Sequence, residues 1–475
     1  MKRALEKCKE IYNKDIPLKI EWIIAVLIGI VMLLLFSYVD FKSLTVWSTN
    51  ILDCIAKGDI TDYYSYTSLN KYGVAHRYIS GTLYSLILWG IWNIPIWAIQ
   101  YFAGKTIVKS AILLIWSKLF LVVSLAITLF ITYKICSILF KDKKIAKWIT
   151  FLSATFVFTY IGVFYAGQND ILICMFAILG LYFLIKEKNI WFYIFSALAI
   201  SIKYFYLIPY IPLILLVEKN IWKIIFKLGI GVSPIIIFNL LVKKFPMYDI
   251  SKTMNHSDRI LKGFFGSGIK ATNGVTISFF ILAFIIICFM AYMSKPKNKE
   301  LKNNYIIYYA VAPIIAMLMF STNYEFYRPI LLMPVLMILY GFKPELFRIN
   351  VILDTVMSGT AFLSVVMRSS YIFSTKYSMN GSLLTDLLGI KQLETFNIRS
   401  PIVNLLGNNL NMASSFITTV LFAALGIILV INHPRFKNDK EEKTEIQKPE
   451  RWIIWGRSVI VVPAIGYLLF KVIGG

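Results

Sequence analysis

Ionisable side chains at the edges of long apolar runs are the residues of this sequence best placed to do chemistry. Asp40 follows the first apolar run, and the stretch "YAGQNDI" places Gln168, Asn169 and Asp170 directly before another run. Charged groups are costly inside a lipid bilayer, so an ionisable residue at a membrane edge is a candidate for function. A carboxylate in such a place can act as a general base toward an attacking hydroxyl.

Two basic residues complete this set. Lys203 lies within the otherwise apolar stretch "AISIKYFYLIPYIPL", and Arg328 follows Glu325 in "NYEFYRPI". Fixed cations can stabilise the negative charge that develops on a phosphate leaving group. Two carboxylates and two cations on one face of the membrane therefore predict a site that handles a lipid phosphate and a sugar hydroxyl.

Each candidate also has a structural interpretation that involves no chemistry. Asp40 could be a solvated residue at the end of a membrane span, and Asn169 with its neighbours could cap a helix. Lys203 could extend along apolar surface until its ammonium reaches water. Arg328 could form an internal ion pair with Glu325.

The composition predicts the elements that must position these residues. The 475 residues are 58% hydrophobic, and mean hydropathy is +0.70. The apolar residues form runs close to the roughly 20 residues that a membrane-spanning helix needs. We therefore expect an all-α polytopic membrane protein with about twelve or thirteen transmembrane helices. The net charge of +24 comes from lysine clusters between these runs, which indicates cytoplasmic loops rather than nucleic-acid binding.

The charge distribution also predicts the topology. The N-terminus is expected in the cytoplasm and a first span at about Ile20–Val39, so that Asp40 emerges outside. An amphipathic helix in "VWSTNILDCIAKGD" is expected along the outer surface. Residues 81–102 could span the membrane or form a re-entrant or interfacial segment. We prefer the re-entrant or interfacial segment, because it places the later lysine clusters on the cytoplasmic side. Lys203 and the prolines after it should break a helical stretch in two.

Two modules are expected on this basis. Residues 1–242 would form the first, with the outer loop 40–110, and residues 243–475 the second. The second would contain outer loops 243–274 and 368–411 and a cytoplasmic segment at 433–452. In the loop 243–274, His256 and Arg259 could read the acceptor, or simply belong to a connecting loop.

The order of these features resembles the GT-C superfamily of integral-membrane glycosyltransferases. Asp40-Phe41 ends the first span, and "ILDCIAKGDITDYY" follows as an amphipathic helix that ends on glycine and tyrosine. Gly167-Gln168-Asn169, with a lysine near proline further on, is similar to family 87, the polyprenyl-phosphate-mannose-dependent mannosyltransferases. In that family proline usually follows the lysine directly, whereas Tyr204 stands here. The resemblance covers about the first half of the chain.

The resemblance implies roles for particular residues. Asp40 matches the general base of the first outer loop, Gln168 and Asn169 match groups that line the site, and Lys203 matches the cation that faces the carrier phosphate. Arg328 lies where a phosphate contact is often found, although no motif supports it. The implied reaction transfers a hexose, with inversion, from a polyprenyl-phosphate sugar to a glycan or glycolipid acceptor on the extracytoplasmic face, as in cell-wall polysaccharide biosynthesis.

No cofactor and no essential metal are expected, although Asp40, Asp53, Asp59 and Asp62 could form a cation site. Two other classes of protein remain open. A transporter or flippase of lipid-linked oligosaccharides would also carry charged residues in its membrane segments, but along a path that reaches both faces. A polysaccharide polymerase or ligase would use basic residues in a large outer loop, such as Arg368 and Arg399 in the loop 368–411.

Overall fold

The computed structural model describes residues 16–69, 83–103, 111–246, 262–270, 275–321, 326–369, 372–375, 379, 383–384, 396–436 and 450–473. The expected all-α architecture is confirmed. Up to residue 242 the described residues form α2 (Lys19–Leu35), α3 (Val39–Ala56), α4 (Tyr63–Leu69), α5 (Leu83–Ala103), α6 (Ala111–Leu139), α7 (Lys143–Ala154), α8 (Val157–Thr159), α9 (Asp170–Ile185), α10 (Asn189–Ile202), α11 (Leu207–Val217) and α12 (Ile221–Val242).

The second half is also mainly helical. It contains α14 (Phe279–Met293), α15 (Lys299–Phe320), α16 (Val335–Tyr340), α17 (Phe347–Arg368), α20 (Arg399–Leu406), α21 (Leu410–Ile431), α22 (Arg451–Val459) and α23 (Val462–Ile473). Before α14, strands β1 (Gly268–Lys270) and β2 (Thr276–Ser278) form a small antiparallel pair in which Gly268 lies opposite Ser278.

Several helices are long and apolar enough to cross a membrane, so the chain is a polytopic membrane protein. Six helices of the described residues meet this requirement, or up to eight if each of two bent helix pairs is one span. One bent pair, Lys143–Ala154 with Val157–Tyr165, turns by 46°. Four further apolar helices, α9, α10, α11 and α14, are shorter than the roughly 20 residues of a typical span.

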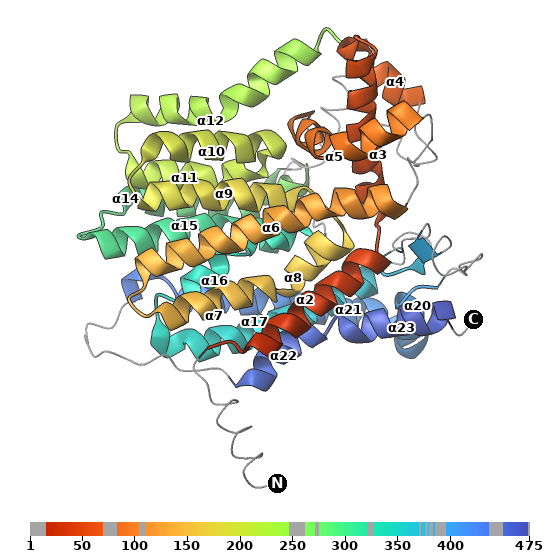
Figure 1. The fold of residues 1–475 in the computed structure, drawn as a ribbon. Coiled ribbons are helices and arrows are strands. Elements are labelled where there is room, and N and C mark those ends of the chain that lie inside the picture. The colour runs from red at the N-terminus through yellow and green to blue at the C-terminus, as the bar shows by residue number, and fades with distance from the viewer. Residues whose placement is uncertain are drawn as a thin grey trace.

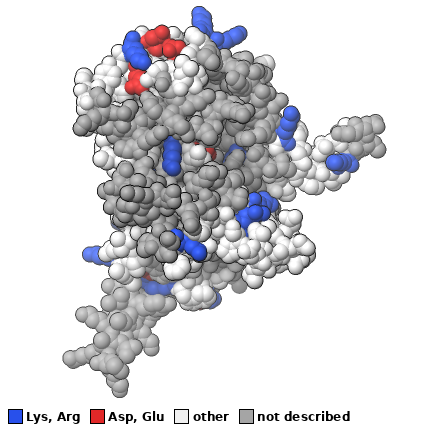
Figure 2. Space-filling view, turned by 90° about the vertical axis from the view of Figure 1, so that its right-hand side faces the viewer, with Lys and Arg blue, Asp and Glu red and all other residues white. Residues whose placement is uncertain are grey.

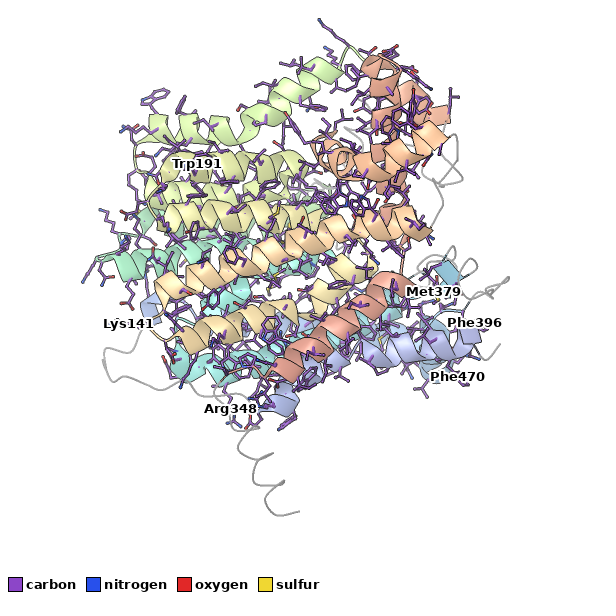
Figure 3. The ribbon with its side chains drawn as sticks, in the orientation of Figure 1. Lys141, Trp191, Arg348, Met379, Phe396 and Phe470 are labelled. Atoms are coloured by element: carbon purple, nitrogen blue, oxygen red, sulfur yellow. The ribbon has the colours of Figure 1, made fainter. Side chains whose placement is uncertain are left out.

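The helices form a bundle with one crossing helix at its end. In Figure 1, α6, α9, α10, α11 and α15 lie side by side, and α3 runs across their direction at the upper right, where it packs against α5 and α6. Helices of the two halves pack on one another, α11 against both α14 and α15. Lys141 lies at the opposite end from Met379 and Phe396 (Figure 3). We call the end that carries α3 the Asp40 end.

The start of α3 differs from the expectation. Helix α2 ends at Leu35, and α3 begins at Val39, so Asp40 lies in the first turn of the crossing helix rather than at the end of a span. Residues 36–38 are extended between the two helices. The reason is a long-range contact, because the Lys118 ammonium donates to the carbonyl oxygen of Phe36 at 2.6 Å and so satisfies the end of α2.

Residues 83–103 form a single continuous helix, α5, with Pro95 inside it. A re-entrant hairpin needs a reversal of the chain, and the described part of this segment has none, whereas a single helix fits both an interfacial segment and a span. Helix α5 packs along α3 and against α6. The indole rings of Trp92 and Trp116 stack at 5.2 Å, and each ring nitrogen donates to the other residue's carbonyl oxygen.

Buried ion pairs tie the C-terminal helices to the rest of the molecule. Arg451 of α22 pairs with Glu21 of α2, and the Trp455 indole nitrogen lies 3.3 Å from the second oxygen of the Glu21 carboxylate. Arg457 pairs with Asp354 of α17, and both side chains are fully buried. These pairs connect α22 to α2, the first described helix, and to α17.

Candidate functional site

The first turn of α3 presents Asp40 to the turn that precedes α9. The Asp40 Oδ2 atom accepts a hydrogen bond from the Gln168 amide nitrogen at 3.1 Å, and Asp40 is only partly buried. The two residues are 128 positions apart in sequence. The carboxylate therefore keeps access to the surface while an amide from a distant segment fixes its orientation.

A tight turn brings Gln168 to this position. Gly167 has φ +59°, a conformation that glycine adopts without steric cost. A Cβ atom added at Gly167 would lie 2.7 Å from the Phe41 ring, so the turn approaches α3 as closely as a residue without a side chain allows. Gly167 therefore sets the distance between the turn and the helix that carries Asp40.

The Asn169 side chain does not cap α9, which removes one structural interpretation of this polar group. Asn169 occupies the N-cap position but makes no side-chain capping bond. Its Oδ1 atom accepts from the Trp89 indole nitrogen at 2.7 Å, and its amide nitrogen donates to the Ser85 hydroxyl at 3.1 Å. Asn169 thus joins α9 to α5, and its side chain is buried.

Asp170 and Lys203 form an ion pair. The Lys203 ammonium lies 2.6 Å from Asp170 Oδ2, so this lysine meets an anion instead of extending freely to water. Asp170 is 1% exposed, whereas the Lys203 side chain is 21% exposed. The other carboxylate oxygen of Asp170 is buried and has no hydrogen-bond partner. The extended backbone of Lys203 separates α10 from α11, as the sequence predicted.

Arg328 lies beside this pair. Its guanidinium sits 4.5 Å from the centre of the Phe205 ring, which belongs to the same break between α10 and α11 as Lys203. The Lys203 ammonium in turn lies 5.5 Å from the centre of the Tyr327 ring. Both contacts are within the range of cation–π interactions. They bring the segment around Arg328 to the Asp170–Lys203 pair.

An apolar cavity lies next to these charges. Ile173, one turn after Asp170, lines it together with Phe205, Pro209 and Leu331. Its volume is about 20 Å³, which is enough for one group the size of a water molecule. The charged groups are therefore bordered on one side by an apolar interior.

Three predicted site residues, Glu325, His256 and Arg259, lie outside the described residues. The expected ion pair between Glu325 and Arg328 is therefore untested. In the loop 368–411, the Arg399 guanidinium donates to the Met367 carbonyl oxygen at 2.8 Å. This contact joins the start of α20 to the end of α17.

No group of three histidine, cysteine, aspartate or glutamate residues that could hold a metal ion occurs in the described parts of the chain. Asp53 accepts from the Trp97 indole nitrogen at 2.7 Å and from the Tyr66 hydroxyl at 3.0 Å. A hydrogen bond from the Thr61 hydroxyl lowers the pKa of Asp59. In Figure 2, which looks onto the Asp40 end, acidic side chains gather at the top of the molecule.

Sequence reasoning missed two residues that shape the site. Trp89 is fully buried and orients Asn169. Lys118 is 1% exposed and holds the end of α2 beside Asp40. The sequence does contain a signal for Lys118. It is a charged residue inside the apolar run 111–140, and a charged residue inside an apolar run is also the reason for selecting Lys203. The role of Trp89 depends on a contact 80 positions away and has no local signal.

Comparisons with known proteins add no family to this geometry. No family model, no curated protein and no solved structure matches the chain. The class established by composition and fold is a polytopic α-helical membrane protein.

Proposed function

We propose that the chain is an integral-membrane glycosyltransferase of the GT-C type. In this proposal it moves a hexose from a polyprenyl-phosphate sugar to an extracytoplasmic glycan or lipid-linked acceptor, with inversion at the anomeric carbon. The observation that carries the proposal is the pairing of Asp40 with Gln168, two residues before the Asp170–Lys203 ion pair. This pairing gathers a partly exposed carboxylate and a cation at one end of an apolar bundle.

Asp40 is the general base of the proposed reaction. The acceptor hydroxyl gives its proton to the Asp40 carboxylate as its oxygen forms a bond to the anomeric carbon. The bond between that carbon and the phosphate oxygen breaks on the opposite face of the sugar, so the configuration inverts. The hydrogen bond from the Gln168 amide fixes the orientation of the Asp40 carboxylate.

Lys203 and Arg328 take the charge of the leaving polyprenyl phosphate. The phosphate gains negative charge as the bond breaks, and fixed cations stabilise that charge best where water is excluded. Asp170 holds the Lys203 ammonium in place. The adjoining cavity of about 20 Å³ is too small for a prenyl chain, so we assign only the phosphate to this corner.

The test uses purified full-length protein in lipid nanodiscs with a panel of radiolabelled polyprenyl-phosphate sugars. We expect consumption of one donor by the wild type and none by Asp40→Asn, with unchanged elution on size exclusion. The matched control is Asp59→Asn, because Asp59 is exposed and bonds only within its own turn. It should transfer at the wild-type rate.

Full activity in Asp40→Asn would refute the general base. Absence of consumption for every donor, together with movement of a lipid-linked oligosaccharide across vesicles, would refute the transferase and favour a flippase. Glycan chains lengthened from a diphosphate-linked donor would instead favour a polymerase or ligase.

A further inference from the structure

The break between α2 and α3 is a second polar centre at the Asp40 end. It comprises three residues, Phe36 to Tyr38, between two helices of 17 and 18 residues. Behind it, the buried Lys118 ammonium contacts the carbonyl oxygens of Phe36, Leu33 and Met32 at 2.6, 3.4 and 3.5 Å. The Lys118 amino group is thus held below the break by three backbone carbonyl oxygens.

Lys42 brings another cation to the same place. Its ammonium makes one long contact, 3.4 Å, with the carbonyl oxygen of Met379 in the outer loop. Met379 also forms a β-bridge with Phe36, whose carbonyl oxygen contacts Lys118. No carboxylate pairs with Lys42 among the described residues, and burial lowers its pKa. Lys42 and Lys118 are close enough to interact electrostatically.

Ser37 supplies an independent sign that this centre is incomplete. Its side chain is 1% exposed, and its hydroxyl has no hydrogen-bond partner. A buried hydroxyl without a partner loses the hydrogen bonds it would make to water, which is unfavourable unless a ligand or water supplies them. Ser37 lies between Phe36 and the N-terminus of α3, where the backbone N–H groups of the first turn favour an anion.

We propose that Lys42, Ser37 and the first turn of α3 bind a phosphate group, with the Lys118 amino group holding the break in place behind them. This site is distinct from the corner of Lys203 and Arg328. Lys42 follows Asp40 by two positions on one helix, which turns the two side chains by about 200° relative to each other. Asp40 accordingly contacts Gln168, while Lys42 contacts the outer loop.

The phosphate site also indicates what the acceptor is, and this step rests on the proposed function. Lys42 and Asp40 lie at the same end of α3 on different sides of it, so the molecule that carries the phosphate must extend around this end to place a hydroxyl against Asp40. The donor phosphate already has its own cations at Lys203 and Arg328. The acceptor is therefore an anionic, phosphate-bearing glycolipid rather than a neutral glycan.

The first arm of the test measures binding alone, using purified full-length protein in neutral-lipid nanodiscs and inorganic diphosphate as the probe. We expect Lys42→Met to weaken binding at least tenfold and Ser37→Ala to weaken it about threefold. Lys42→Arg keeps the charge and should retain most of the affinity. The matched control is Lys57→Met, because Lys57 is exposed at the other end of α3 and should not affect binding.

The second arm compares sources of the phosphate group. Polyprenyl diphosphate incorporated in the nanodisc should compete with inorganic diphosphate if the ligand is lipid-linked, whereas an anionic phospholipid should compete if it is a membrane headgroup. Binding that is equal in wild type and in folded Lys42→Met overturns the site. If Lys42→Met fails to fold, equal binding in wild type and Ser37→Ala overturns it instead.

Turnover separates this proposal from the proposed function. Where the wild type transfers sugar, Lys42→Met should raise the KM for the acceptor at least tenfold and leave the KM for the donor unchanged. A raised donor KM instead would overturn the assignment to the acceptor. If no transfer occurs in the wild type but Lys42-dependent diphosphate binding is present, the glycosyltransferase fails and the anion site stands.

Discussion

The Asp170–Lys203 ion pair makes an asymmetric prediction about stability. Lys203→Met leaves the Asp170 carboxylate, 1% exposed, without its cation. Removal of one partner from a buried ion pair costs about 3–5 kcal/mol. Asp170→Asn leaves the Lys203 ammonium, but that side chain is 21% exposed and can reach water, so the expected loss is about 1–3 kcal/mol. The lysine substitution should therefore be the more damaging one.

Titration of the micelle-solubilised protein with SDS, followed by helical circular dichroism, gives the free energies of unfolding. The double variant Asp170→Asn with Lys203→Met removes both charges. We expect its loss of unfolding free energy to be smaller than the sum of the two single-variant losses by at least about 1 kcal/mol, as for residues in contact. Lys188→Met, at an exposed lysine, should change stability by no more than about 0.5 kcal/mol. A larger loss in Asp170→Asn than in Lys203→Met, or additive losses, would contradict the reasoning.

Two further predictions concern a glycine and a histidine. Gly167→Ala should lower the free energy of unfolding by more than about 1 kcal/mol. A residue with a Cβ is strained at φ +59°, and the added Cβ also collides with the Phe41 ring. The same SDS titration measures the loss, and a variant as stable as the wild type would show that the turn can relax. Burial and the charges of Arg435 and Lys343 lower the pKa of His433 below 6.5, so the neutral ring stabilises the fold above the unfolded-state pKa. The free energy of unfolding of the wild type should decrease as the pH is lowered from about 7 to about 5. The decrease should be smaller in His433→Asn. Parallel plots of unfolding free energy against pH for the two proteins would exclude this contribution.

The sequence was most informative where apolar runs alone define a helix. The apolar runs predict helices at about Ala111–Phe140, Ile171–Ile185 and Ile224–Leu241. Helices α6, α9 and α12 begin and end within three residues of these bounds, because lysine-rich or polar loops separate the runs. The break between α10 and α11 was also predictable, since Lys203 and the prolines that follow it interrupt an apolar stretch. The approach of Gln168, Asp170 and Lys203 to one another followed from their expected position at the same end of neighbouring helices.

The position of Asp40 could not be predicted from local pattern. The run that ends in "LLLFSYVDF" stays apolar across the break between α2 and α3, so hydropathy gives no reason for a helix to stop at Leu35. The reason is Lys118, which lies 82 positions after Phe36 and contacts its carbonyl oxygen. In the same way, α5 remains one helix despite Pro95, because α3 and α6 pack along it.

The ion pair between Glu21 and Arg451 joins residues 430 positions apart, and this separation has a consequence for biosynthesis. The segment that carries Glu21 is synthesised 430 residues before its counter-charge. Throughout translation the nascent protein therefore holds an acidic group that lacks its final partner. The buried pair can form only after α22 has been synthesised, so a chain that stops before residue 451 leaves the Glu21 carboxylate without its cation.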